Sequence, residues 1–248
     1  MIEVIGITRN YNSFAAVSDL SFRVESGEVM GLVGPNGAGK TTTLRCIVGI
    51  IPPTRGDVII DGHSILHDPL AAKRAIGFMP DEPRLFEHLT VIEHLQFTAR
   101  IYGIDGFEEK AQSLLDELEL SDHRESLATE LSRGMKQKLV IACGLLHAPH
   151  NLIFDEPLTG LDPLGIRRMK ATILDRARKG ASVIVSSHLL HLVEEICDRI
   201  LILKEGRKII HGSLEEISAS LPELRGDLNL EEIFFRVTSG AADEGSGK

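Results

Sequence analysis

Residues along this chain fall into short, continuous apolar runs and longer segments with helical periodicity. The strand-like runs are EVMGLVG (28–34), DVIIDG (57–62), AIGFM (75–79), NLIFDEP (151–157) and SVIVSSH (182–188). The centres of the last two are fully apolar, which is typical of strands that are buried on both faces. The pattern therefore predicts a mainly parallel sheet that is covered by helices.

Helical periodicity fills much of the sequence between these runs. KTTTLRCIVGI (40–50) reads as a helix, and the pattern is helical from about 90 to 147. Roughly the first 25 residues predict antiparallel strands instead. DRILILKEGRKIIHG (198–212) predicts a hairpin that turns at Glu205-Gly206.

These patterns suggest how the chain is organised. We expect one domain over residues 1–238, interrupted by an all-helical insert at about 82–150. Residues 239–248 are small and polar, and we expect them to form a disordered tail.

Composition narrows the range of partners. The net charge of −9 argues against nucleic acid as the main partner, because phosphate backbones need a basic surface. Cys46, Cys143 and Cys197 are widely spaced, so we expect neither disulfides nor structural zinc, and a reducing cytosol is the natural compartment. The sequence shows no signal peptide and no apolar stretch of about 18 residues. Other chains would have to hold this protein at a membrane.

The segment GPNGAGKTT (34–42) carries a phosphate-binding loop. It matches G-x-x-x-x-G-K-[ST] and lies between a strand-like run and a helix, and this context disfavours a chance glycine-rich turn. Backbone N–H groups would surround phosphate oxygens, Lys40 would reach the β/γ-phosphates, and Thr41 would hold Mg²⁺. The expected nucleotide-binding residues here are Gly34, Pro35, Asn36, Gly37, Ala38, Gly39, Lys40, Thr41 and Thr42.

With this loop, the predicted fold class is α/β. We expect a P-loop NTPase core with a mainly parallel sheet, an N-terminal antiparallel β subdomain and an inserted α-helical subdomain. In such a sheet, ligands bind beyond the carboxyl ends of the strands.

Two carboxylates and a histidine are predicted at that edge. Asp155 would support the Mg²⁺ shell, and Glu156 would polarise the attacking water. His188 closes the strand SVIVSSH and would approach the γ-phosphate. The alternatives are a solvated loop for the carboxylate pair and a structural role for His188. The expected catalytic residues are Glu156 and His188.

A second helix start lies at ELSRGMKQKL. Ser132 is a good N-cap residue, and Gly134 follows it inside the first turn. Taken alone, this segment predicts only a capped helix. It does not explain why a chain with a complete phosphate-binding loop has another Ser/Gly-rich helix start.

The order of the motifs supplies an explanation. GPNGAGKTT, LSRGM, LIFDEP, GLD and SSH occur in the order and approximate spacing of ABC-type ATPase subunits, so the chain resembles that family over about residues 1–235. The resemblance implies that two such domains close head to tail around two ATP molecules. It further implies that Ser132 and Gly134 bind the nucleotide held by the partner, that Asp162 lies at the dimer seam and that Tyr11 stacks on adenine. The alternative for Tyr11 is a core aromatic residue.

The sequence departs from the family pattern near two of these motifs. Arg133 and Met135 stand where the family usually has glycine and glutamine, and Arg133 adds positive charge near a phosphate site. Asp81 stands where the family usually has a glutamine that contacts Mg²⁺ and senses the membrane partner. Because Mg²⁺ prefers hard oxygen ligands, we expect Asp81 to join Thr41 and Asp155 at the metal. The alternative is that Asp81 caps a turn after Pro80 and faces water.

The resemblance implies an ATP-hydrolysing, Mg²⁺-dependent subunit of a membrane transporter. The sequence is most like bacterial exporter subunits. We expect integral-membrane transporter chains as partners, a homodimer or a heterodimer with another ABC ATPase subunit, and a location on the cytoplasmic face of the cell membrane. A soluble ABC-type ATPase with a non-transport role is the alternative. A P-loop kinase or GTPase is disfavoured by LSRGM and by the absence of NKxD.

Overall fold

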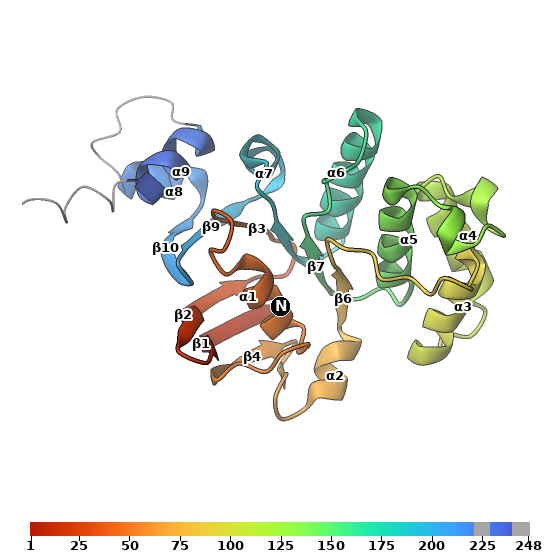
Figure 1. The fold of residues 1–248 in the computed structure, drawn as a ribbon, viewed down its shortest axis with the longest axis horizontal. Coiled ribbons are helices and arrows are strands. Elements are labelled where there is room, and N and C mark those ends of the chain that lie inside the picture. Colours follow the sequence, from red (N-terminus) through yellow and green to blue (C-terminus); the bar gives the residue numbers. More distant parts are fainter. Residues whose placement is uncertain (221–228, 240–248) are drawn as a thin grey trace, which may run out of the picture.

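The computed structural model describes residues 1–220 and 229–239, and it contains two sheets surrounded by helices (Figure 1). The predicted tail lies outside these residues except for Ser239, which ends the last helix. The strands are β1 (Ile2–Tyr11), β2 (Phe14–Val24), β3 (Val29–Val33), β4 (Arg55–Ile60), β5 (His63–Ser64), β6 (Ile76–Met79), β7 (Asn151–Asp155), β8 (Ser182–Ser186), β9 (Arg199–Lys204) and β10 (Arg207–Gly212). The α-helices are α1 (Lys40–Ile47), α2 (Pro69–Arg74), α3 (Val91–Tyr102), α4 (Phe107–Glu117), α5 (Arg133–Leu146), α6 (Pro163–Arg178), α7 (Leu190–Ile196), α8 (Leu214–Ser220) and α9 (Leu230–Ser239).

The larger sheet has six strands in the order β10-β9-β3-β8-β7-β6. All neighbouring pairs are parallel except β9 and β10, which form the predicted hairpin. Glu205 and Gly206 turn this hairpin with φ angles of 50° and 74°, the left-handed values that a two-residue connection between twisted strands requires. The predicted α/β fold class is confirmed.

The central strands of this sheet face a different core on each side. Leu152, Phe154 and Val183 point into the core shared with α3, α4 and α5, whereas Ile153 and Ile184 point into the core shared with α1 and the smaller sheet. Because successive side chains alternate across a strand, both alternating sets must be apolar. This packing explains the continuous apolar runs in the sequence.

The smaller sheet is antiparallel, with strand order β2-β1-β4-β5. It lies beside α1 (Figure 1), and it confirms the antiparallel strands predicted near the N-terminus. Apolar residues such as Ile7, Leu20 and Val58 fill the space between this sheet and the P-loop side of the larger sheet. The smaller sheet therefore supports the segment that follows β3.

Helices α3, α4 and α5 form a cluster at the β6 side of the larger sheet (Figure 1). All three fall inside the segment that we interpret as a helical insert. Thr90 starts α3 with a capping box, since its hydroxyl accepts from Glu93 N while the Glu93 carboxylate accepts from Thr90 N. This cap fixes where α3 begins.

Across residues 1–220 and 229–239, no helix combines the length and apolar character needed to cross a bilayer.

Candidate functional site

The P-loop connects β3 to α1 at the carboxyl edge of the larger sheet. Gly39 has a φ angle of 100°, and a Cβ atom there would lie 2.5 Å from the carbonyl oxygen of Ala16. Only glycine fits such a backbone at such a distance, so the smaller sheet can press directly against the loop. Within residues 1–220 and 229–239, no side chain caps α1, which leaves its first N–H groups available for an anion.

Lys40 is the first residue of α1, and its ammonium group folds back onto the P-loop. Its Nζ donates to the carbonyl oxygen of Gly34 at 2.7 Å and lies 3.4 Å from that of Pro35. Burial lowers the pKa of Lys40, and the nearby Glu156 and Asp155 carboxylates oppose that effect. The ammonium therefore lies within the electrostatic reach of both acidic residues, as a phosphate-binding lysine of this site should.

Asp155 ends β7, the strand next to β8, and Glu156 follows it directly. Asp155 is 3% exposed, and its Oδ1 accepts a hydrogen bond of 2.6 Å from the Ser186 hydroxyl on β8. The same hydroxyl accepts from the backbone N–H of Glu156 at 3.1 Å. Ser186, which we did not single out in the sequence, therefore fixes both acidic residues from the neighbouring strand.

Glu156 and His188 are in direct contact. His188 Nδ1 lies 2.8 Å from Oε2 of Glu156, and the backbone N–H of His188 lies 3.4 Å from the same oxygen. Glu156 has a φ angle of 52°, so the chain turns sharply after β7 and aims the carboxylate toward the end of β8. The two predicted catalytic residues thus belong to one cluster.

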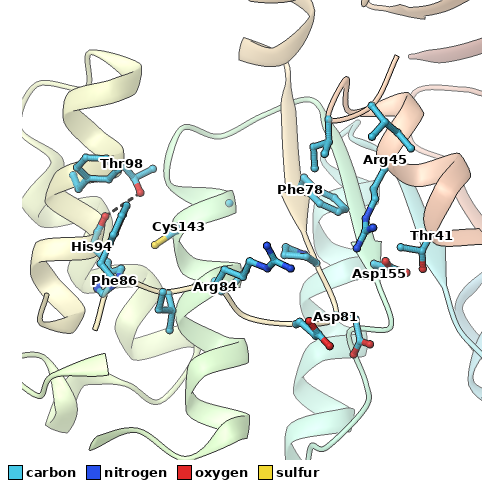
Figure 2. Close-up of a pocket in the computed structure, with 18 residues that line it drawn as sticks. Thr41, Arg45, Phe78, Asp81, Arg84, Phe86, His94, Thr98, Cys143 and Asp155 are labelled. Atoms are coloured by element: carbon cyan, nitrogen blue, oxygen red, sulfur yellow. Dashed lines mark hydrogen bonds between the residues drawn. The ribbon is translucent and has the colours of Figure 1, made fainter. Parts of the chain in front are cut away.

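A cavity of about 750 Å³ begins beside these residues (Figure 2). Thr41 and Asp155 line one end, Asp81 lies on the loop that follows β6, and His94 and Phe86 line the far end near α3. The three predicted metal ligands, Thr41, Asp81 and Asp155, therefore border the same space. Burial and the negative charge of Asp155 raise the pKa of Asp81, while Arg133 counteracts this shift.

The donor set at this end suits Mg²⁺. It consists of one hydroxyl and two carboxylates, which are hard oxygen ligands, and Mg²⁺ in nucleotide sites completes its shell with water and phosphate oxygens. Within the described ranges, no group of three or more His, Cys, Asp or Glu side chains is arranged to hold a metal alone. The hydroxyl and two carboxylates therefore suit a metal whose other ligands are water and phosphate oxygens.

Helix α5 supplies two further contacts to the loop after β6. Gln137 is 3% exposed, and its Nε2 donates to the carbonyl oxygen of Pro80 at 3.3 Å. Arg133, one turn earlier, lies 3.9 Å from Asp81. Neither contact could be predicted from local patterns, because residues more than 50 positions apart meet here only through folding.

Ser132 is the N-cap of α5, with its hydroxyl accepting from Met135 N at 3.3 Å. Asp162 is the N-cap of α6 and accepts from Gly165 N at 2.9 Å. The two helix starts are neighbours, since a Cβ atom on Gly134 would lie 3.5 Å from the carbonyl oxygen of Gly160. Ser132 and Gly134 do not line the cavity that Thr41 and Asp155 border.

Tyr11 lies at the end of β1, where its side chain is 42% exposed. That exposure argues against the alternative of a buried core aromatic and leaves the ring accessible to a planar ligand.

Known proteins resemble this chain in sequence and in fold. Residues 17–159 match the profile described as ABC transporter. The chain is 33% identical over 240 residues to the ABC-type transporter ATP-binding protein EcsA of Bacillus subtilis (strain 168), covering 96% of each chain.

Two solved structures are similar as well. An ATP-binding subunit of an ABC transporter has a TM-score of 0.91 and 36% identity, over 96% of this chain and 99% of that one. A dimeric ATP-binding cassette in a post-hydrolysis state, bound to ADP and Pi, has a TM-score of 0.78 and 25% identity, over 86% of this chain and 99% of that one.

Proposed function

Because this chain belongs to the ABC transporter family, as an ATP-binding subunit with ATPase activity, we propose that it drives export through separate membrane-spanning chains. In this proposal, two ATP-binding subunits close head to tail around two ATP molecules, and hydrolysis opens them again. The observation that carries head-to-tail closure is the neighbouring pair of helix starts at Ser132 and Asp162, where a Cβ atom on Gly134 would lie 3.5 Å from the carbonyl oxygen of Gly160. The N-termini of these two helices would form the surface that contacts a nucleotide bound to another subunit.

The nucleotide bound by the chain itself would lie on the P-loop, from Gly34 to Thr42. Phosphate oxygens would accept from backbone N–H groups and would replace the Gly34 carbonyl as the partner of Lys40. Tyr11 would stack on the base. The polar first turn of α5, with Ser132 and Gly134, would face the γ-phosphate of the partner's ATP, and Asp162 would lie at the seam.

Mg²⁺ would be held by Thr41, Asp155 and Asp81, and it would supply positive charge to the phosphate oxygens. The chain's own residues carry out the remaining steps. Glu156 would orient and polarise the attacking water, since its carboxylate is only 15% exposed and is held by His188, while Ser186 on β8 holds its backbone N–H. His188 Nδ1 lies 2.8 Å from that carboxylate, and its ring would approach the γ-phosphate.

The cavity beside the site is where we place contact with the membrane-spanning partner. Its outer part carries apolar side chains that remain accessible, with Ile50 57%, Phe86 55% and Phe97 43% exposed. Asp81 lies on the loop between this part and the proposed nucleotide site. A partner that displaces the loop would therefore move one of the proposed metal ligands directly. Such a partner would hold the chain on the cytoplasmic face of the cell membrane.

Membrane fractionation with co-purification tests the proposal. We expect the tagged chain to sediment with membranes and to co-purify, in detergent, with an integral-membrane protein that changes its ATPase rate. The Lys40→Ala variant should co-purify with the membrane protein to the same extent and should show no ATP hydrolysis. A fully soluble ATPase with no such partner would contradict the transport role and would favour a non-transport function.

A separate comparison tests direction. Cells that lack the chain are compared with parent cells by untargeted profiling of the cytosol and the medium. Export predicts a compound that accumulates inside the cells and declines in the medium. The opposite redistribution would identify an importer.

A further inference from the structure

Arg9 lies against the face of the Tyr11 ring. The guanidinium carbon of Arg9 is 4.7 Å from the centre of that ring, which is within the range of a cation–π contact. Both residues belong to the last part of β1, before the turn at Asn12 leads into β2. One face of the exposed aromatic ring is therefore already occupied within the chain.

Arg9 is itself held in place. Its Nη1 donates to the carbonyl oxygen of Pro52 at 2.9 Å, which ties β1 to the segment after α1. Its Nε is buried and has no hydrogen-bond partner among the residues that the structure describes. The charge of Arg9 also reaches Cys46, on α1, where it opposes the rise in thiol pKa caused by burial. The charge of Arg9 is therefore close enough to the P-loop helix to act on a side chain of that helix.

A buried nitrogen without a hydrogen-bond partner destabilises the fold, so another interaction of Arg9 must compensate for this cost. The face of the Tyr11 ring provides that interaction, because an aromatic ring attracts a cation that has lost part of its hydration. Arg9 in turn restrains the ring, which stands at the end of a strand and would otherwise rotate freely. A ring that is already oriented loses less conformational freedom when a base stacks on it.

We propose that Arg9 is a positioning residue for the nucleobase, since it holds the Tyr11 ring so that the base of ATP stacks on the opposite face. The inference rests on the proposed binding of ATP. It extends that function by assigning to Arg9 a contribution that acts on the base and leaves the phosphates untouched.

The chain offers a clean optical readout. It contains two tyrosines and no tryptophan, so Tyr102→Phe leaves Tyr11 as the sole fluorophore of this kind. In that background, quenching of Tyr11 reports base stacking. Titration calorimetry with Mg²⁺-ATP and with Mg²⁺-tripolyphosphate separates base binding from phosphate binding.

Three substitutions are compared. Arg9→Met keeps an unbranched stem and removes the charge, and Tyr11→Ala removes the ring. Arg23→Met is the matched control, since Arg23 lies in the same sheet and pairs with Glu25 at the surface. We expect Arg9→Met to weaken ATP binding by about three- to tenfold and to reduce quenching, with tripolyphosphate affinity unchanged. Arg23→Met should match the parent for both ligands.

The outcomes are distinct. Equal weakening of ATP and tripolyphosphate by Arg9→Met would mean that Arg9 only stabilises the fold near the P-loop, and the proposal would be wrong. Unchanged ATP affinity and quenching in Arg9→Met, with loss in Tyr11→Ala, would overturn it as well. If Tyr11→Ala bound ATP as tightly as the parent, Tyr11 would not stack on the base, and the proposed role of Arg9 would be wrong. If the parent protein bound neither ligand, the proposed ATP site itself would fail.

Discussion

Oδ1 of Asp81 lies 3.9 Å from Nη2 of Arg133, which brings together two charged residues that both depart from the family pattern. Asp81 belongs to the loop after β6, and Arg133 opens α5. The guanidinium also lies close to Gly160, since a Cβ atom there would be 3.5 Å from Nε. The side chains of Asp81 and Arg133 are 43% and 68% exposed, so the pair contributes at most about 1 kcal/mol to stability. The pair instead balances charge beside the cavity that Thr41 and Asp155 border.

Asp81→Asn should make ATP binding less dependent on Mg²⁺. The charged carboxylate repels a metal-free triphosphate, and the amide does not. The ratio between ATP affinity with Mg²⁺ and with chelator should therefore fall, by roughly three- to tenfold. Calorimetric titration measures both affinities. A ratio equal to that of the parent would place Asp81 outside the site.

Arg133→Gly should change the same ratio in the opposite direction. Without the guanidinium, the negative charge of Asp81 is no longer balanced, and metal-free ATP is repelled more strongly. In the double variant Asp81→Asn/Arg133→Gly, the ratio should return close to that of Asp81→Asn alone. Strict additivity of the two effects would show that the residues act independently.

Glu156→Gln should retain ATP binding and lose hydrolysis, with a fall in turnover of about 10² or more. The amide keeps the size of the carboxylate but cannot accept a proton from water. ATP-bound chains should then accumulate as a dimer in size-exclusion chromatography. A monomer at saturating ATP and Mg²⁺ would contradict homodimer closure and would make a heterologous ATPase partner the better hypothesis.

Lys40→Ala and Ser132→Arg should separate the two phosphate-binding elements. Lys40→Ala should abolish nucleotide binding by the monomer. Ser132→Arg should leave that binding nearly unchanged and abolish turnover, because it blocks the surface facing the partner's ATP. Ser132→Ala is the matched control, since it loses the same helix cap, worth about 1 kcal/mol, without adding bulk. Equal loss of monomer affinity in the Lys40 and Ser132→Arg variants would argue against a role in trans.

Cys46 should react slowly with thiol reagents, whether or not nucleotide is present. The side chain is fully buried on α1, and burial raises the pKa of its thiol to about 11, so little thiolate exists near neutral pH. Labelling should become fast only in denaturant. Strong protection by ATP in the native state would instead show that α1 opens when nucleotide leaves.

The same thiol should make the protein less stable in alkali. The unfolded thiol ionises near pH 9, whereas the folded thiol stays protonated until about pH 11. The contribution of this thiol to the free energy of unfolding is therefore present below pH 9 and is lost as pH rises toward 11. The loss should approach about 3 kcal/mol, because each of the two pKa units corresponds to about 1.4 kcal/mol. Cys46→Ala should lower the melting temperature at neutral pH and flatten its decline above pH 9. An unchanged slope would exclude this origin.

Local sequence determined much of the fold and the core of the site. The apolar centres of β7 and β8 identified buried strands, because a strand covered on both faces must be apolar at every position. The P-loop could be located because its backbone needs conformations and close approaches that only glycine tolerates, and this need appears directly in the sequence. Boundaries were less exact: the helix predicted over 40–50 ends at Ile47, before Gly49 takes a φ angle of 65°.

Only the tertiary structure decided which side chains meet. Glu156 contacts His188, Asp81 faces Arg133, and Arg9 lies on Tyr11. The first two contacts join residues that are far apart in the chain, and their distance depends on how strands are ordered in the sheet and how α5 packs against β6. The third joins near neighbours, but its geometry depends on an anchor at Pro52. Sequence patterns record the burial and backbone demands of each segment, whereas side-chain contacts arise from packing between segments.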